Sequence, residues 1–351
     1  PAPPKIYTLS LHDALPIWGG KSLCFQLPAA LLPGLTVVVY PLLSLMADQE
    51  RRLQIAGLPC RVLKGGQKRE ERDLLWRDLG EGRVRVLLTN PESLAADDTR
   101  RRLSGLDVAH FVVDEAHCVA EWGETFRPAY LSLGETAALI RPKVTTAFTA
   151  TASPEVLDRV VSHLFGGAGP NLVSADPDRP NIRYAVFPVL AKDAALALLL
   201  GGAENAKRRP AVVFCRSRGG AELTARALRL RLREKDVFFY HAGLEKDEKT
   251  RIEKIFFPSR SGILAATCAY GLGIDKADIR TVVHRDVPGS VEAYLQESGR
   301  GGRDGLPAEA VLLWNSEDSV RLNETGDPSA RSRFAAMLDY RLARECRRRR
   351  L

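Results

Sequence analysis

The stretch Val108–His117 (VAHFVVDEAH) places an acidic pair directly after an apolar run. Such a run is typical of a strand that is covered on both faces of a sheet. Asp114 and Glu115 then lie at the carboxyl end of that strand, the edge where α/β sheets bind ligands. There Asp114 can hold Mg²⁺ through water, and Glu115 can orient and deprotonate an attacking water. A solvated strand end is the alternative interpretation of this pair.

Similar apolar runs recur on both sides of this stretch and alternate with longer amphipathic stretches. This alternation predicts an α/β fold with a mostly parallel sheet and helices on both faces. The expected strands are Leu35–Tyr40, Val84–Thr89, Val108–Asp114, Val144–Thr149, Ala211–Cys215, Asp236–Tyr240, Gly262–Thr267, Ile279–His284 and Glu309–Trp314. The expected helices include Leu42–Gly57, Pro154–Phe165, Gly219–Glu234 and Glu245–Phe257.

The alternation pauses once, at Gly166–Pro180 (GGAGPNLVSADPDRP), where three Gly and three Pro lie among polar residues. Such a stretch is typical of a domain boundary. We therefore expect a first domain over 19–174, a second over 175–318, and the start of a further subdomain over 319–351. Residues 1–18 show little periodicity and a poorly formed strand, so we expect them to be disordered or foreign to the protein.

The composition is that of a globular protein with an excess of positive charge. The 351 residues include 51 Lys and Arg against 43 Asp and Glu, a formal charge of +8, which favours a polyanionic partner. No apolar run approaches the roughly 18 residues of a membrane span, which excludes an integral membrane protein. None of the six cysteines forms a C-x-x-C pair, so reduced thiols in a cytoplasmic protein are expected.

A glycine turn supplies the second half of the predicted site. Gly19-Gly20-Lys21-Ser22 precedes the apolar helical stretch Leu23–Leu32. Backbone N–H groups in such a turn approach phosphates closely, the lysine reaches the outer phosphates, and the serine hydroxyl can hold Mg²⁺. On its own the motif also fits an ordinary turn at a helix start. Together with Asp114 and Glu115 it predicts a site for ATP and Mg²⁺.

Further blocks of sequence follow one another in order along the chain. They are Val37–Gln49 (VVVYPLLSLMADQ), Asp114–Tyr130 (DEAHCVAEWGETFRPAY), Phe148–Ala152 (FTATA), Tyr240–Leu244 (YHAGL), Ala266–Asp275 (ATCAYGLGID) and Gln296–Gly305 (QESGRGGRDG). In these blocks, from about Gly19 to its C-terminus, the chain resembles the RecQ family of superfamily 2 DNA helicases. The aromatic-rich loop after DEAH separates that family from other DEAH-type helicases.

The resemblance implies two tandem RecA-like domains that form an ATP-driven motor. Such a motor moves 3′ to 5′ on single-stranded DNA and unwinds duplexes in DNA repair and recombination. Nucleotide is expected between the domains, and the catalytic residues are expected to be Glu115, Gln296, Arg300 and Arg303. The two arginines would neutralise charge on the transferred phosphoryl group, as an arginine finger does. A helix cap in a surface turn is the alternative interpretation of these arginines.

The resemblance also implies residues that connect ATP with DNA. Asp275 is expected near the nucleotide, where it helps couple the two domains, and His117 is expected to have a coupling role. Exposed aromatic side chains beside a cation suit base stacking and phosphate contact, although core packing is the alternative for an aromatic pair. The residues expected to bind DNA are Ser44, Trp122, Phe126 and Arg127.

The expected partners are ATP and single-stranded, forked or junction DNA. The family's activity implies a monomeric protein of the cytoplasm, associated with the nucleoid in a bacterium. Asp178–Tyr184 (DRPNIRY) matches the family's inter-domain segment, and a plain linker is the alternative.

The chain departs from the family at both ends. Trp18 stands where the family has a glycine and Ile17 where it has a threonine, so we expect weakened nucleotide binding. Cys346 resembles the first of four zinc ligands, but the chain ends before the other three, so no bound zinc is expected. These departures predict a fragment that is truncated at both ends.

Two alternatives to a helicase motor follow from these departures and from the superfamily. One is a nucleic-acid-binding fragment that hydrolyses ATP poorly. The other is an RNA-directed helicase of the same superfamily, against which the loop after DEAH argues. A small-molecule P-loop kinase would not need the motif blocks of the second domain.

Overall fold

The computed structural model describes residues 5–9, 22–119, 128–149, 154–173, 178–267, 276–343 and 345–351. It describes the backbone alone over 5–9, and it describes the other side chains except those of residues 44, 246 and 329. The chain divides into two compact units, Pro1–Asp178 and Arg179–Leu351.

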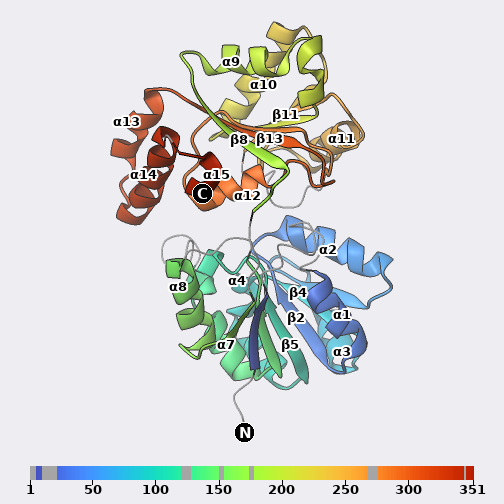
Figure 1. The fold of residues 1–351 in the computed structure, drawn as a ribbon. Coiled ribbons are helices and arrows are strands. Elements are labelled where there is room, and N and C mark those ends of the chain that lie inside the picture. The colour runs from blue at the N-terminus through green and yellow to red at the C-terminus, as the bar shows by residue number, and fades with distance from the viewer. Residues whose placement is uncertain are drawn as a thin grey trace. The chain divides into compact units, whose positions relative to one another are not determined.

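The first unit is built on a seven-stranded parallel sheet with the strand order β3-β4-β2-β5-β6-β1-β7 (Figure 1). Its strands are β1 (Lys5–Leu9), β2 (Leu35–Val39), β3 (Cys60–Leu63), β4 (Val86–Thr89), β5 (Val108–Val113), β6 (Val144–Ala147) and β7 (Asn171–Val173). Its helices are α1 (Leu23–Leu31), α2 (Leu43–Ile55), α3 (Arg69–Gly80), α4 (Pro91–Leu94), α5 (Asp97–Ser104), η1 (Pro128–Tyr130), α7 (Leu133–Ile140) and α8 (Pro154–Phe165).

The second unit is built on a six-stranded parallel sheet with the order β10-β11-β9-β12-β13-β8. Its strands are β8 (Ile182–Pro188), β9 (Ala211–Phe214), β10 (Val237–Tyr240), β11 (Ile263–Ala266), β12 (Thr281–His284) and β13 (Ala308–Trp314). Its helices are α9 (Lys192–Leu200), η2 (Ala203–Arg208), α10 (Arg218–Leu232), α11 (Lys246–Phe256), α12 (Val291–Ser298), α13 (Glu317–Glu324), α14 (Pro328–Leu342) and α15 (Arg347–Arg350).

The two sheets repeat one topology. In sequence order, β8 to β13 occupy the same places in their sheet as β1 to β6 occupy in theirs, and β7 is an addition at one edge. The helix α9 connects β8 to β9 as α1 connects β1 to β2. Except for β7, the carboxyl end of each strand in one sheet therefore has a counterpart in the other sheet.

Helices cover both faces of each sheet, as the sequence predicts. In the first unit, α3, α5, α7 and α8 share one apolar cluster with alternate strand residues, and α1 and α2 bury other residues against the opposite face. In the second unit, α9 and α10 pack with one set of strand residues and α11 with the other set (Figure 1). Consecutive buried residues in β2, β4 and β5 confirm strands covered on both faces.

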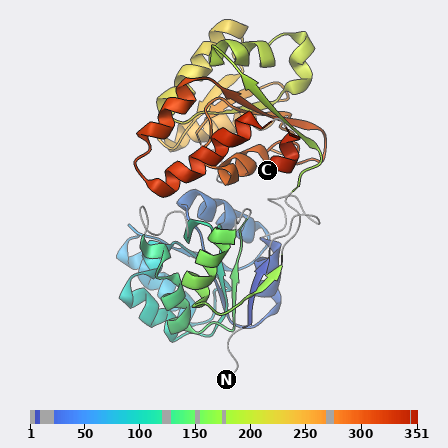
Figure 2. The same cartoon turned by 60° about the vertical axis from the view of Figure 1, so that its left-hand side comes forward.

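The nine expected strands and the four expected helices are confirmed to within two residues at each end. Strands β1, β3, β7 and β8 were not among the expected elements. Within residues 1–18, which were expected to be disordered or foreign to the protein, β1 pairs in parallel with both β6 and β7 (Figure 2). The origin of these residues stays a prediction. The residues KIYTL of β1 suit a pleated surface, but five residues are too few to show a period. Strand β7 lies inside the stretch that was interpreted as a boundary.

Candidate active site

The acidic pair forms a strained turn at the end of β5. The N–H of Asp114 donates to the carbonyl of Val39 at 3.0 Å, and the N–H of Glu115 donates to Asp114 Oδ1 at 3.0 Å. Glu115 has a φ of 50° and is 2% exposed. Left-handed backbone at a residue other than glycine costs about 1–3 kcal/mol, and it is found where the surrounding structure holds it. The next N–H, that of Ala116, donates to the carbonyl of Phe148 at 2.8 Å.

His117 connects this turn to the segment after β6. Its Nδ1 lies 3.4 Å from Glu115 Oε2 and 3.2 Å from Thr149 Oγ1. The imidazole is buried, so both contacts are made away from water. One side chain therefore touches both the DEAH turn and the start of the FTATA block, which gives the expected coupling role of His117 a geometric basis.

Tyr40, a residue of this edge, was not among the expected site residues. It follows β2, the neighbour of β5, and is 1% exposed. Burial raises the pKa of its phenol well above the usual value, and nearby carboxylates raise this pKa further. These carboxylates are Asp114, Asp48 and Glu115. Arg52 lowers the same pKa, and Asp48 is paired with Arg51 and Arg52 at 2.9 and 2.7 Å. Asp114 and Glu115 remain as carboxylates at this edge, and Mg²⁺ prefers oxygen ligands of this kind.

Ser22 lies at the N-terminus of α1. Its carbonyl accepts from the N–H groups of Phe25 and Gln26 at 3.3 and 2.9 Å. Ser22 has helical dihedral angles, φ −62° and ψ −35°, and its hydroxyl makes no capping hydrogen bond. The hydroxyl is therefore compatible with the expected role as a Mg²⁺ ligand, at the end of the helix where the dipole favours anions.

The expected arginines of the second unit lie in turns that follow α12. Gln296 is half-buried in α12, Arg300 is 1% exposed and Arg303 is 9% exposed. Gly302, between the arginines, has a φ of 56°, and a Cβ there would lie 2.5 Å from the carbonyl oxygen of Leu306. Glycine is thus needed at this point of the block, for both conformation and space.

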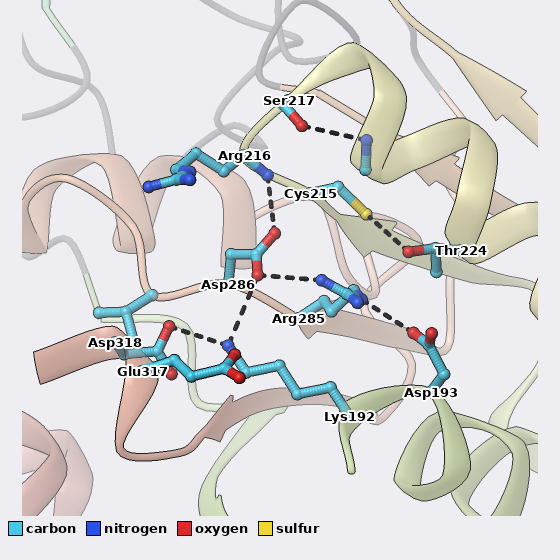
Figure 3. A network of polar contacts seen from close by, with 12 residues as sticks. Lys192, Asp193, Cys215, Arg216, Ser217, Thr224, Arg285, Asp286, Glu317 and Asp318 are labelled. Atoms are coloured by element: carbon cyan, nitrogen blue, oxygen red, sulfur yellow. Dashed lines mark hydrogen bonds and ion pairs between the residues drawn. The ribbon is translucent and has the colours of Figure 1, made fainter. Parts of the chain in front are cut away.

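The edge of the second unit that corresponds to the acidic pair carries a network of ion pairs (Figure 3). Arg285 and Asp286 directly follow β12, as Asp114 and Glu115 directly follow β5. Lys192, the first residue of α9, places its Nζ 2.8 Å from Asp318 Oδ1 and 3.5 Å from Asp286 Oδ1.

The other ion pairs of this network are those of Arg285. Its Nε lies 2.9 Å from Asp193 Oδ1, and its Nη1 lies 3.1 Å from Asp286 Oδ1. A cavity of about 430 Å³ adjoins the network. The charged side chains that line it are Lys192, Arg216, Arg285, Arg321, Asp286, Glu317, Asp318 and Glu324. Four cations face four carboxylates, so this edge has no excess of positive charge for a polyphosphate.

Several expected site residues lie outside the described residues. They are Gly19, Gly20, Lys21, Trp122, Phe126, Arg127 and Asp275. Ser44 lies in α2, but its side chain is outside the description. Cys346 is exposed before α15, and the N–H groups of Arg349 and Arg348 lower the pKa of its thiol.

The described residues contain neither a cluster of metal-binding side chains nor a membrane-spanning helix. In this part of the chain no group of three or more His, Cys, Asp or Glu side chains is arranged to hold a metal ion. Mg²⁺ in nucleotide sites is usually held by one or two carboxylates, phosphates and water, so a larger group is not required. The same part of the chain contains no helix with the length and apolar character that a membrane span requires.

Two family models match the chain, one in each half. The DEAD/DEAH box helicase model matches residues 18–160, and the helicase conserved C-terminal domain model matches residues 191–305. The chain is also similar to the ATP-dependent DNA helicase RecQ of Pasteurella multocida, with 35% identity over 320 residues, 90% of this chain and 50% of the relative. It is 35% identical over 338 residues to the RecQ-like DNA helicase blm-1 of Caenorhabditis elegans, which covers 90% of this chain and 33% of the relative. The chain thus spans from a third to a half of the length of these curated relatives.

A solved structure shares the fold of this chain. A crystal structure of the DUF1998 helicase MrfA bound to DNA matches with a TM-score of 0.71 and 20% identity, over 91% of this chain and 48% of that one. At this identity the match supports the fold, which is that of tandem helicase motor domains.

Proposed function

Because the chain belongs to the RecQ family of superfamily 2 helicases, we propose that it is the motor core of an ATP-dependent DNA helicase that moves 3′ to 5′. The proposal assigns residues 19–174 to an ATP-binding domain, 175–318 to a second motor domain, and 319–351 to the start of a zinc-binding subdomain. The whole protein acts as a cytoplasmic monomer on single-stranded, forked or junction DNA, in repair and recombination.

The main support for this proposal is the strained turn at Glu115. A carboxylate that is 2% exposed, on a residue with φ of 50°, needs a compensating reason to be held at a strand end. Orientation and deprotonation of the water that attacks ATP supplies such a reason. His117 lies between Glu115 and Thr149, so a change in the FTATA segment alters the surroundings of this base.

ATP and Mg²⁺ fit the rest of the first unit's edge. Ser22 and Asp114 would hold the ion, with Lys21 on the outer phosphates and the N–H groups of Gly19 and Gly20 on the phosphate oxygens. When bound, Mg²⁺ neutralises phosphate charge. The carboxylates of Asp114 and Glu115 at the end of β5 provide oxygen ligands, which supports a divalent cation at this edge.

The second unit contributes cations to the same reaction. Arg300 and Arg303 neutralise charge that develops on the transferred phosphoryl group, and Gln296 contacts the nucleotide. Asp275 couples the two units. DNA is bound by Ser44 and by the loop residues Trp122, Phe126 and Arg127, through phosphate contact and base stacking. The net charge of +8 supports a polyanionic partner.

The proposal is tested by measuring ATP hydrolysis and strand separation by the 351-residue chain. We expect hydrolysis to rise with single-stranded DNA more than with RNA of the same sequence, and unwinding to require a 3′ overhang. Greater stimulation by RNA would favour the RNA-directed alternative. DNA binding without hydrolysis would favour the impaired fragment, for which Trp18→Gly with Ile17→Thr is the repair to try.

A further inference from the structure

The segment that resembles an inter-domain linker makes specific contacts inside the second unit. Arg179 Nη1 donates to the carbonyl of Gly299 at 3.0 Å, and its Nη2 donates to the carbonyls of Gly301 and Gly302 at 3.2 and 3.0 Å. These carbonyls belong to residues 299–303, which we call the arginine turn because Arg300 and Arg303 lie in it. One guanidinium therefore bonds to three peptide groups that surround the expected catalytic cations.

A second side chain from the same segment completes this contact. Asn181 Nδ2 donates to the carbonyl of Gly302 at 2.7 Å and to that of Leu306 at 2.9 Å. The N–H of Gly302 donates to the carbonyl of Ile279 at 2.8 Å, so this glycine is held on both sides. A Cβ at Gly302 would lie 2.5 Å from Asn181 Nδ2, which shows how closely the segment and the arginine turn approach.

The C-terminal helix supports the segment from its other side. Arg348 Nη1 donates to the carbonyl of Arg179 at 3.0 Å, and its Nη2 donates to the carbonyl of Ile182 at 2.6 Å. The guanidinium of Arg348 also lies 5.6 Å from the ring centre of Tyr184. The backbone that carries Arg179 is thus fixed from α15 as well.

The chemistry of the contact favours arginine. Burial lowers the pKa of Arg179, and its hydrogen-bond partners among the described residues are neutral carbonyls. Half-burying a guanidinium without a carboxylate is costly, and the hydrogen bonds that the charged group donates offset this cost. A planar fork with two Nη groups can reach peptide groups on both sides of Arg300, whereas a lysine offers a single nitrogen.

We propose that Arg179 is the positioning residue of the arginine turn. It fixes the peptide groups between Arg300 and Arg303, so that both guanidiniums keep the geometry that phosphoryl transfer needs. The proposal rests on the role proposed above for these two arginines. It gives the DRPNIRY segment a task beyond connecting domains.

The test compares variants of the full chain. Arg179→Ala removes the fork, Arg179→Lys keeps a charge and much of the packing, and Arg183→Ala is the matched control, because Arg183 lies four residues further on in β8 with an 80% exposed side chain. Hydrogen exchange of peptides covering 299–303, nucleotide Kd and DNA-stimulated kcat are measured for each. A displacement of about 1 Å can cost roughly 100-fold in rate.

We expect Arg179→Ala to speed exchange in the arginine turn and to lower kcat by about 100-fold, with nucleotide Kd within about threefold. Millimolar guanidinium should restore part of kcat. Arg179→Lys should keep the fold but show at least a tenfold loss, and Arg183→Ala should match the unaltered chain. If Arg179→Ala fails to fold, Arg179→Lys is compared with the unaltered chain in its place.

Two results would overturn the proposal, and they differ from failure of the proposed function. Unchanged exchange in the arginine turn of both Arg179 variants overturns it, whatever the activity. Unchanged kcat in those variants overturns it when Arg303→Ala, measured beside them, lowers kcat. If Arg303→Ala also leaves kcat unchanged, the proposed role of the arginines is wrong, and the positioning proposal is rejected with it.

Discussion

The two units have the same strand order, but the corresponding edges of their sheets differ in chemistry. After β5, Glu115 is buried in a left-handed turn, and carboxylates gather around Tyr40. After β12, Asp286 and its neighbours are paired with Lys192 and Arg285 in one network (Figure 3). One edge holds a buried carboxylate in a strained turn, and the other pairs its charged side chains with one another.

We infer from this difference that the chemistry of such an edge depends on a few residues and not on the fold. A parallel sheet offers both units the same edge, where ligands commonly bind. In the second unit that edge is occupied by its own ion pairs, so the catalytic role proposed for this unit is assigned to the arginine turn after α12. We therefore expect matched substitutions at the two edges to have different consequences, one in rate and the other in stability.

The largest effect is expected from amide substitutions at the two corresponding acids. Glu115→Gln should lower DNA-stimulated kcat by roughly 10²–10⁴-fold while nucleotide still binds, because a general base contributes about this much. Asp286→Asn should leave kcat within about threefold and lower stability by about 1–3 kcal/mol, since it weakens hydrogen bonds to charged groups. Steady-state kinetics and urea unfolding measure both. Equal losses of kcat in the two variants would contradict the comparison.

The next largest effect, on stability alone, is expected at the buried ion pair of Lys192 and Asp318. Lys192 and Asp318 are each 7% exposed at the side chain and lie 2.8 Å apart. Lys192→Met leaves Asp318 buried with its cation removed, which should cost about 3–5 kcal/mol. The control is Lys143→Met in the first unit, where an exposed pair with Asp107 at 2.8 Å should cost at most about 1 kcal/mol. Similar midpoints of urea unfolding for the two variants would show that the network contributes little.

Acid should destabilise the first unit through His110 in β5. Its Nε2 lies 2.8 Å from Thr146 Oγ1, and burial lowers its pKa from 6.5 to about 4. Between these values the unfolded chain binds more protons than the folded chain, so stability is full above pH 6.5 and is lost as pH falls toward 4. The loss should reach about 3 kcal/mol.

Hydrogen exchange resolved by unit, at pH 7 and pH 4.5, measures this effect. Peptides of β5 and β6 should lose protection in acid, and His110→Gln should reduce that loss because glutamine does not titrate. A loss of the same size in His110→Gln would assign the acid sensitivity of the first unit to other groups.

Local patterns predicted most of the strands but not the contacts between distant residues. Consecutive apolar residues revealed β5 because both faces of that strand are buried, and the acidic pair after it was therefore expected at the sheet edge. The pair Lys192–Asp318 joins residues 126 apart, and the contact of Arg179 with Gly302 joins residues 123 apart, so no periodicity could show them. Strand β7 has three residues, too few for a pattern.

The smallest effect should change sign between the units. Among the described residues, Tyr40 Oη has no hydrogen-bond partner although it is buried, whereas Tyr240 Oη donates to Glu253 Oε1 at 2.7 Å. A buried polar group without a partner costs about 1–3 kcal/mol, and a hydrogen bond to a charged group contributes a similar amount. Tyr40→Phe should therefore stabilise the chain by about 1 kcal/mol, and Tyr240→Phe should destabilise it by about as much. Urea midpoints at equal m values measure both changes. Destabilisation by Tyr40→Phe would mean that the hydroxyl is bound after all, and the edge after β2 would then be less strained than the comparison requires.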